Sequence, residues 1–414
     1  LEDARRRSAA DGNASMEGAA MVMQAWLYST LTMAYGDIPY TEAIGGLNSE
    51  NFRPAYDDQE FILNDLLDNL DRANTLLSSN EGNITGDIIL NNNPMMWRKL
   101  ANSLRLRLLM HLSNKQDVSE EMQTIVSNEP YLSEIGEDAV LEYLNNFPNE
   151  FPLFPLKQGD FDAVVISDNV VSVFEGYDDP RLIEYARPNN INVIDTMPSA
   201  EPEFSGAENG NEFGDCNKNG SRLGTRYYDY PDQPIGDTRA NGILMTHAET
   251  ELILAEAALK GFISEDPETH YRRGIESSMM YYGVDFSSFG WNDFDDFYNN
   301  SGIAYSGELD QVWEQKWAAI FFHGLEPFFE TRRWHYEVNF NFDEIPVRPN
   351  TLDAHRLIRW AQGQDLGEAM LDALHKAFFE ERRDIGDTAV LAEIAGEVGL
   401  DAGLVAELLT TDRD

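Results

Sequence analysis

Two groups of aromatic residues stand in polar stretches of this sequence, where an apolar core does not readily explain them. Tyr227, Tyr228 and Tyr230 follow one another in a segment rich in Gly, Asp and Asn, and Phe289 and Trp291 lie in a second such segment. Flat rings beside amide groups suit the faces of sugars and the side chains of peptides. The sequence therefore predicts a ligand groove lined by these five residues. Packing of the loops onto a scaffold is the alternative.

Catalytic chemistry has little support. The sequence contains no G-x-S-x-G, P-loop, dinucleotide-binding or HExxH motif. Adjacent carboxylates such as Asp178-Asp179 could suggest glycoside hydrolysis, but such pairs arise by chance among 73 acidic residues. We expect a binding protein that is not an enzyme and that uses no cofactor.

Metal and thiol chemistry are equally restricted. Residues 215–220 begin like a calcium loop, but the twelfth position is Arg226, where a bidentate Glu would be needed. An Asn/Gly turn is the favoured interpretation, with a partial calcium site as the alternative, and we expect no metal. Cys216 is the only cysteine, so neither an intramolecular disulfide nor a CxxC motif can form.

Charge, hydropathy and length limit which classes of protein this chain can belong to. The net charge of −43 disfavours nucleic acid as a partner, because phosphate backbones are bound by basic surfaces. The sequence has no apolar run of about 18 residues, the length that a membrane-spanning helix needs. The 414 residues are enough for a large core and for two or three domains.

Helical periodicity defines the elements that must position these residues. Apolar residues recur at steps of three and four along several segments, which predicts helices at 14–35, 57–77, 94–113, 246–260, 268–282, 308–323 and 325–334. Between about 130 and 242, short apolar runs alternate with Pro, Gly, Asn and Asp, which predicts an irregular subdomain that faces the ligand. Small residues such as Ala255 and Ala257 are consistent with tetratricopeptide-like helix pairs that approach closely.

Several motifs in order along residues 1–348 together resemble the SusD/RagB family of nutrient-binding outer-membrane lipoproteins, in its SusD-like branch. They are Tyr35-Gly36-Asp37-Ile38-Pro39-Tyr40, the run from Trp97 to Arg107, Asp179-Pro180-Arg181-Leu182, Leu244-Met245-Thr246 with Glu249, Leu254-Ala255-Glu256-Ala257-Ala258, Trp313-Glu314-Gln315-Lys316-Trp317 and Arg332-Arg333. We interpret the motif tryptophans as core residues and the motif arginines as partners of carboxylates. The motifs thus identify a scaffold and do not locate a ligand.

The resemblance implies a mainly α-helical fold in which tetratricopeptide-like helix pairs support loops that hold an oligosaccharide or peptide. It also implies that the protein lies at the cell surface on the outer membrane and passes nutrient to a SusC-like TonB-dependent transporter. The signal peptide and the lipid-anchor cysteine of the family are absent from this chain.

The C-terminal residues resemble a different family. Residues 349–414 contain segments, including Pro349–Leu357 and Glu397–Asp401, that are similar to the helical subdomain of DsbA-family, FrnE-type oxidoreductases. This predicts two domains, 1–348 and 349–414, in a chimera with a junction near residues 347–350 that arose by gene fusion or sequence assembly. Natural acquisition of a domain is the alternative. A thiol-disulfide oxidoreductase or redox chaperone is the rival function, and the missing CxxC motif disfavours it.

Overall fold

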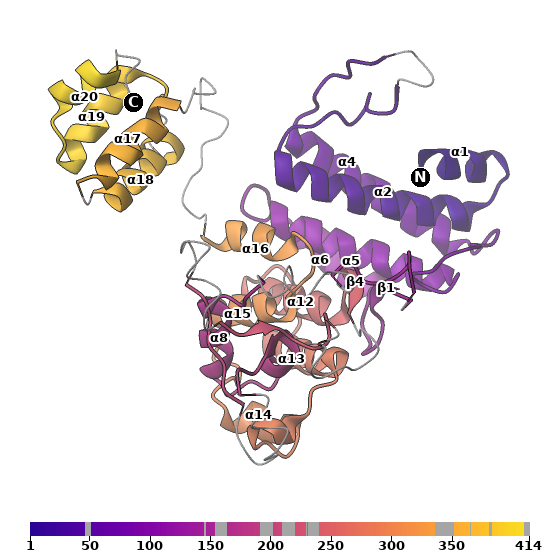
Figure 1. Ribbon diagram of the computed structural model, residues 1–414. Helices are drawn as coiled ribbons and strands as arrows, with labels where there is room; N and C mark the ends of the chain where they lie inside the picture. The colour runs from indigo at the N-terminus through magenta and orange to yellow at the C-terminus, as the bar shows by residue number, and fades with distance from the viewer. Residues whose placement is uncertain are drawn as a thin grey trace. The chain divides into compact units, whose positions relative to one another are not determined.

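A computed structural model describes residues 1–45, 51–144, 146–153, 164–190, 202–208, 220–228, 230, 240–335, 352–364, 366–380 and 383–409. The chain forms two compact units, Leu1–Thr331 and Arg332–Asp414. Helices dominate the described residues of both units, which confirms the expected mainly α-helical class (Figure 1). Cys216, the residues 215–219 of the calcium-like loop and the segment 347–350 lie outside the described residues.

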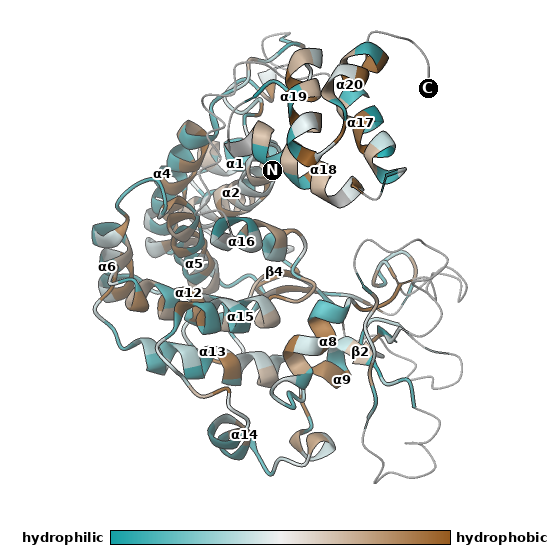
Figure 2. Ribbon diagram, turned by 90° about the vertical axis from the view of Figure 1, so that its left-hand side faces the viewer, coloured by the Kyte–Doolittle hydropathy of each residue, from teal (hydrophilic) through white to brown (hydrophobic). Residues whose placement is uncertain are grey.

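Helices that pack side by side form the N-terminal part of the first unit. They are α1 (Glu2–Ala10), α2 (Ala14–Tyr35), α4 (Gln59–Ser78), α5 (Pro94–Leu112) and α6 (Ser119–Asn128). Three of these helices begin with a side-chain cap. Asn13 accepts a hydrogen bond from the N–H of Met16 at the start of α2, and Asp58 and Asn93 accept from backbone N–H groups at the starts of α4 and α5. In Figure 2 the ribbon of α4 alternates between hydrophilic and hydrophobic segments, as expected of an amphipathic helix with one buried face.

A second set of helices follows the irregular segment. These are α12 (His247–Leu259), α13 (Pro267–Tyr282), α14 (Phe294–Asn300), α15 (Leu309–Ala319) and α16 (Glu326–His335). Helix α15 ends four residues before its predicted end at 323. The cause is local: Phe322 has a φ of 65° and Gly324 a φ of 63°, which a right-handed helix cannot contain.

Two short sheets organise the described part of the irregular segment. Strand β1 (Ala139–Glu142) pairs antiparallel with β4 (Asn241–Met245), so the two ends of the segment meet at the helical scaffold. Between them lie α8 (Asp168–Glu175), α9 (Leu182–Tyr185), β2 (Ala186–Arg187) and β3 (Arg222–Leu223), with β2 and β3 also antiparallel. The segment is therefore an excursion from the scaffold that begins and ends at one β-ladder.

Close helix approach depends on two glycines of the first unit. A Cβ atom at Gly18 in α2 would lie 2.8 Å from Cγ of Leu77 in α4, and one at Gly274 in α13 would lie 2.5 Å from Cγ of Leu252 in α12. These distances are shorter than van der Waals contact, so each glycine allows its helix pair to pack closely.

Along the described residues, no helix is both long and apolar enough to cross a membrane.

The second unit has its own apolar core. Its helices are α17 (Leu352–Gln362), α18 (Gly367–His375), the π-helix η3 (Lys376–Glu380), α19 (Thr388–Val398) and α20 (Ala402–Leu409). Leu357, Leu374, Leu391 and Ile394 are buried within one cluster that contains only residues of this unit. Leu371 of α18 and Leu404 of α20 lie outside this cluster and are 39% and 54% exposed.

Candidate ligand-binding site

The three predicted tyrosines lie in the interior of the irregular subdomain. Tyr227, Tyr228 and Tyr230 are only 3%, 5% and 2% exposed and belong to one apolar cluster. The hydroxyl of Tyr230 donates a hydrogen bond of 2.8 Å to the carbonyl of Leu223. Their burial leaves almost no ring surface for direct stacking on a ligand. The sequence pattern indicated a group of aromatic residues, but it could not show which of their rings are buried and which are exposed.

Phe289 and Trp291, the other two predicted residues, are partly exposed. Nε1 of Trp291 donates a hydrogen bond of 2.9 Å to the carbonyl of Asp178, and its ring contacts Phe297 edge-on at 5.7 Å between centroids. Phe289 stacks on Phe204 at 6.4 Å. Their contact with a ligand stays a prediction, since the two pockets described next are lined by other residues.

One of these pockets has mostly aromatic walls. The aromatic pocket has a volume of about 380 Å³ and is lined by Val170, Trp317, Phe321, Phe322, Gly324 and Pro327. Phe322 is 41% exposed and Trp317 is partly exposed. Trp317 was interpreted from the sequence as a core residue, and Phe321 and Phe322 were not singled out. The spacing of Trp317 and Phe321 is a sequence signal, because residues four apart share one face of a helix, but the observed helix ends at Ala319.

The end of α15 builds the aromatic pocket. The helix stops at Ala319, and the neighbouring rings of Phe321 and Phe322 are tilted by 44° to each other. Phe321 stacks on Tyr185 with centroids 4.3 Å apart, and Tyr227 lies behind Phe322 at 4.6 Å. A positive φ at a bulky residue costs roughly 1–3 kcal/mol and persists only where the surroundings enforce it. The buried tyrosines supply that support, so they hold the exposed rings in place.

The chemistry of this pocket suits binding. None of the described lining side chains is ionisable, so this part of the pocket offers no general acid or base. Apolar aromatic surface of this kind can receive the C–H faces of a sugar ring or an apolar side chain.

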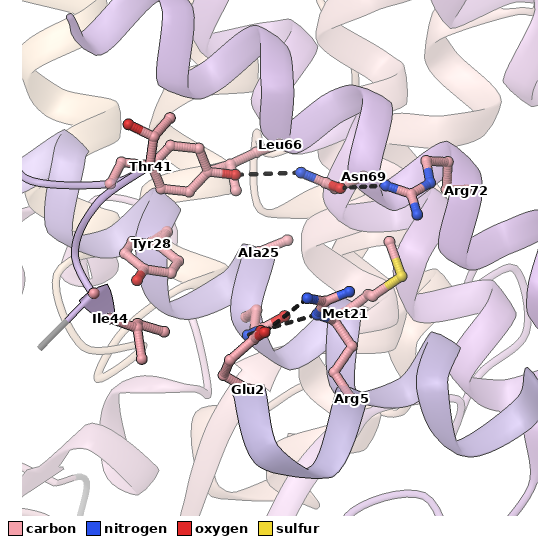
Figure 3. Close-up of a pocket in the computed structure, with 13 residues that line it drawn as sticks. Glu2, Arg5, Met21, Ala25, Tyr28, Thr41, Ile44, Leu66, Asn69 and Arg72 are labelled. Carbon is pink, nitrogen blue, oxygen red and sulfur yellow. Dashed lines mark hydrogen bonds and ion pairs between the residues drawn. The ribbon is translucent and has the colours of Figure 1, made fainter. Parts of the chain in front are cut away.

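A second pocket lies among the N-terminal helices (Figure 3). This polar pocket has a volume of about 420 Å³, and its polar lining residues are Glu2, Arg5, Gln24, Tyr28, Tyr40, Thr41, Asn69 and Arg72. Met21, Ala25 and Leu66 add apolar surface from α2 and α4.

Hydrogen bonds fix several of its polar groups. Arg5 donates two hydrogen bonds to Glu2, of 2.9 and 2.7 Å. The hydroxyl of Tyr40 donates to Asp65 at 2.6 Å and accepts from Asn69 at 3.2 Å. Burial, reinforced by the bond to Asp65, raises the pKa of Tyr40 well above its usual range, so this hydroxyl stays protonated.

The motif residues meet in buried ion pairs. Arg107 of α5 donates to both carboxylate oxygens of Glu249 in α12, at 2.6 and 2.7 Å. Burial raises the pKa of the Glu249 carboxyl, but Arg107 and His323 together outweigh it and the net pKa is lowered. Arg181 donates to Asp179 and to Gln315, both at 2.6 Å. These motif residues thus join distant parts of the chain.

Other motif residues are also structural. Trp97 is 4% exposed and donates to Asp87 at 2.8 Å. Arg98 pairs with Glu129 at 2.6 Å, and Arg105 pairs with both Asp71 and Glu121 at 3.0 Å. The structure confirms the interpretation of Trp97 as core and of these arginines as partners of carboxylates.

One group of side chains in the described part has the types and spacing of a metal site. Potential ligand atoms of His111, Glu326 and Glu330 lie within 4.8 Å of one another. However, Nζ of Lys316 is 2.8 Å from Glu330, and Nε of Arg107 is 3.8 Å from Glu326. Two buried cations already balance these carboxylates, so a metal ion would have to displace or oppose them. The arrangement fits an ion-pair network better than a metal centre.

Two family models match different parts of the chain. A SusD-like family model, described as "Starch-binding associating with outer membrane", matches residues 1–348. A model for a DSBA-like thioredoxin domain matches residues 329–414. No curated protein matches the chain.

Solved structures with the same fold include an outer membrane protein of Bacteroides vulgatus for which nutrient binding has been suggested. It is 29% identical, with a TM-score of 0.68 over 78% of this chain and 74% of that one. A SusD homologue of Bacteroides fragilis is 24% identical, with a TM-score of 0.67 over 79% and 73% of the two chains. A chitin-binding protein is 23% identical, with a TM-score of 0.62 over 82% and 70%.

Proposed function

Because this chain belongs to the SusD-like family, matched over residues 1–348, we propose that it binds an oligosaccharide nutrient outside the cell. The observation that carries the proposal is the aromatic pocket, with Trp317 and Phe322 partly exposed on the unit that matches the family. One structural relative binds chitin, which makes oligosaccharides the first ligands to screen. A peptide with apolar side chains is the alternative ligand.

Delivery completes the proposal. Family members associate with the outer membrane. The bound nutrient would pass at the cell surface to a SusC-like TonB-dependent transporter. The described lining residues of the aromatic pocket carry no ionisable group, which is in keeping with transfer of an unaltered ligand.

Three of the five sequence-predicted residues have a role in the proposed site. Tyr227 supports the rings of the aromatic pocket from behind. Phe289 and Trp291 remain candidates for direct contact with a longer ligand, because both rings are partly exposed on the loop at the end of η1 (Phe286–Phe289).

Binding of an oligosaccharide library by the Trp317→Ala and Phe322→Ala variants tests the proposal. Loss of one stacking contact should weaken affinity about fivefold, the equivalent of about 1 kcal/mol. Calorimetric titration with the best ligand measures the change. Phe61→Ala serves as the control, because this ring is 49% exposed on α4 and does not line the aromatic pocket. Equal affinities for Phe322→Ala, Trp317→Ala and the control would refute the assignment.

A redox function is the second candidate, because residues 329–414 match a DSBA-like domain. Disulfide exchange through a dithiol needs two cysteines, and the sequence contains one, Cys216, outside the matched residues. The binding function is therefore favoured over a redox function.

A further inference from the structure

The polar pocket is unusual for its charge. The chain carries a net charge of −43, yet two arginines, Arg5 and Arg72, line this one pocket. Among the described lining residues Glu2 is the acidic one, and Arg5 already engages both of its oxygens. Gln24 donates a further hydrogen bond of 3.0 Å to Glu2. The negative charge of Glu2 is thus satisfied within the pocket.

Arg72 is the group that remains available. Its guanidinium donates to the amide oxygen of Asn69 at 3.3 Å, and within the described residues it has no carboxylate partner. Its side chain is exposed, so binding an anion would require little desolvation. In Figure 3, Arg72 and Arg5 lie on one side of the pocket, and Tyr28 and Ile44 lie on the other. A planar guanidinium with free donors is well suited to a carboxylate, which it can bind through two hydrogen bonds.

The opposite wall offers a different kind of surface. The rings of Tyr28 and Tyr40 meet edge to face, with centroids 4.8 Å apart and an interplanar angle of 88°. Both are only partly buried, and the hydroxyl of Tyr28 makes no hydrogen bond with the described residues. A ligand that fits both walls carries one anionic group and several hydroxyls on a ring.

From this arrangement we propose that the polar pocket is a second binding site, for a sugar that carries a carboxylate. The carboxylate would pair with Arg72, and the ring hydroxyls would donate to the amide oxygen of Asn69 and bond to the hydroxyl of Tyr28. The amide nitrogen of Asn69 is already engaged, because it donates to Asp65 and to Tyr40. A volume of about 420 Å³ is in the range of pockets that hold a small ligand. A ligand with one charge fits better than a polyanion, which the acidic chain would repel. The site does not depend on the aromatic pocket or on a transporter.

Titration of the full chain with D-galacturonic acid and with neutral D-galactose tests this proposal. At millimolar sugar concentrations, the wild type should bind galacturonic acid more tightly than galactose. Arg72→Gln should weaken binding of the acid about tenfold, because one charge-assisted pair is lost, and leave binding of galactose unchanged. Arg72→Lys should retain part of the preference. Circular dichroism verifies that each variant is folded.

Two controls separate this site from general charge and from the aromatic pocket. Arg272→Gln removes the same charge from an exposed arginine of α13 outside the pocket and should not change the affinity for the acid. Trp317→Ala should not change it either. The proposal is overturned if the wild type does not bind galacturonic acid or binds both sugars equally, or if Arg272→Gln weakens binding as much as Arg72→Gln.

Discussion

Arg107 and Glu249 are opposite charges held almost entirely out of water. Their side chains are 7% and 0% exposed, and the guanidinium also donates to the carbonyl of Leu244 at 3.0 Å. A buried ion pair contributes little net stability relative to apolar residues, but removal of one partner leaves the other charge uncompensated. The loss of stability should therefore be large when only one partner of the pair is removed.

Replacement of Arg107 with Ala should lower the free energy of unfolding by about 3–5 kcal/mol, because Glu249 would remain buried without its main partner. Urea denaturation measures the change. Arg6→Ala is the matched control, since the pair of Arg6 with Asp3 is largely exposed and should contribute little to stability. A loss for Arg107→Ala no larger than that of the control would contradict this account of the network.

At the scale of elements, helix positions could be predicted and the aromatic pocket could not. Asn13 before α2 and Asn93 with Pro94 at the start of α5 are local signals, so the sequence located those ends closely. The end of α15 was not visible, because the apolar residues continue through Phe321 and Phe322. Burial of Tyr227 depends on residues nearly a hundred positions away, which no local pattern contains.

The close packing of α12 against α13 predicts that a larger residue at their contact destabilises the protein. Gly274→Ala should lower the free energy of unfolding by roughly 1–3 kcal/mol, because the added Cβ would overlap the buried side chain of Leu252. Thermal unfolding measures the change. Gly396→Ala in α19 is the control: its Cβ would meet Ala402 at 3.4 Å, an ordinary contact, so helix propensity should make it neutral or stabilising. A neutral Gly274→Ala would show that the two helices can separate without cost.

On the scale of the whole molecule, two families divide one chain. The matches overlap at residues 329–348, and the second unit, Arg332–Asp414, contains a core cluster made only of residues from 354 to 409. Our proposal is that residues 349–414 form a separable helical domain that contributes nothing to ligand binding by residues 1–348.

Deletion of residues 352–414 tests this proposal. The remaining chain should keep its main melting transition and its affinity for an oligosaccharide, because the described core of the deleted part is self-contained. Differential scanning calorimetry of the full and shortened chains measures the transitions. A large fall in the remaining transition would show instead that the C-terminal helices complete the core of the first unit.

The central claim, that the aromatic pocket binds an oligosaccharide, is tested most directly by a crystal structure of the chain with the tightest-binding glycan from a screen. The account predicts a sugar ring within about 4 Å of Trp317 or Phe322, in van der Waals contact with the ring face. A glycan bound elsewhere with the aromatic pocket empty, or a screen in which no oligosaccharide binds, would contradict it.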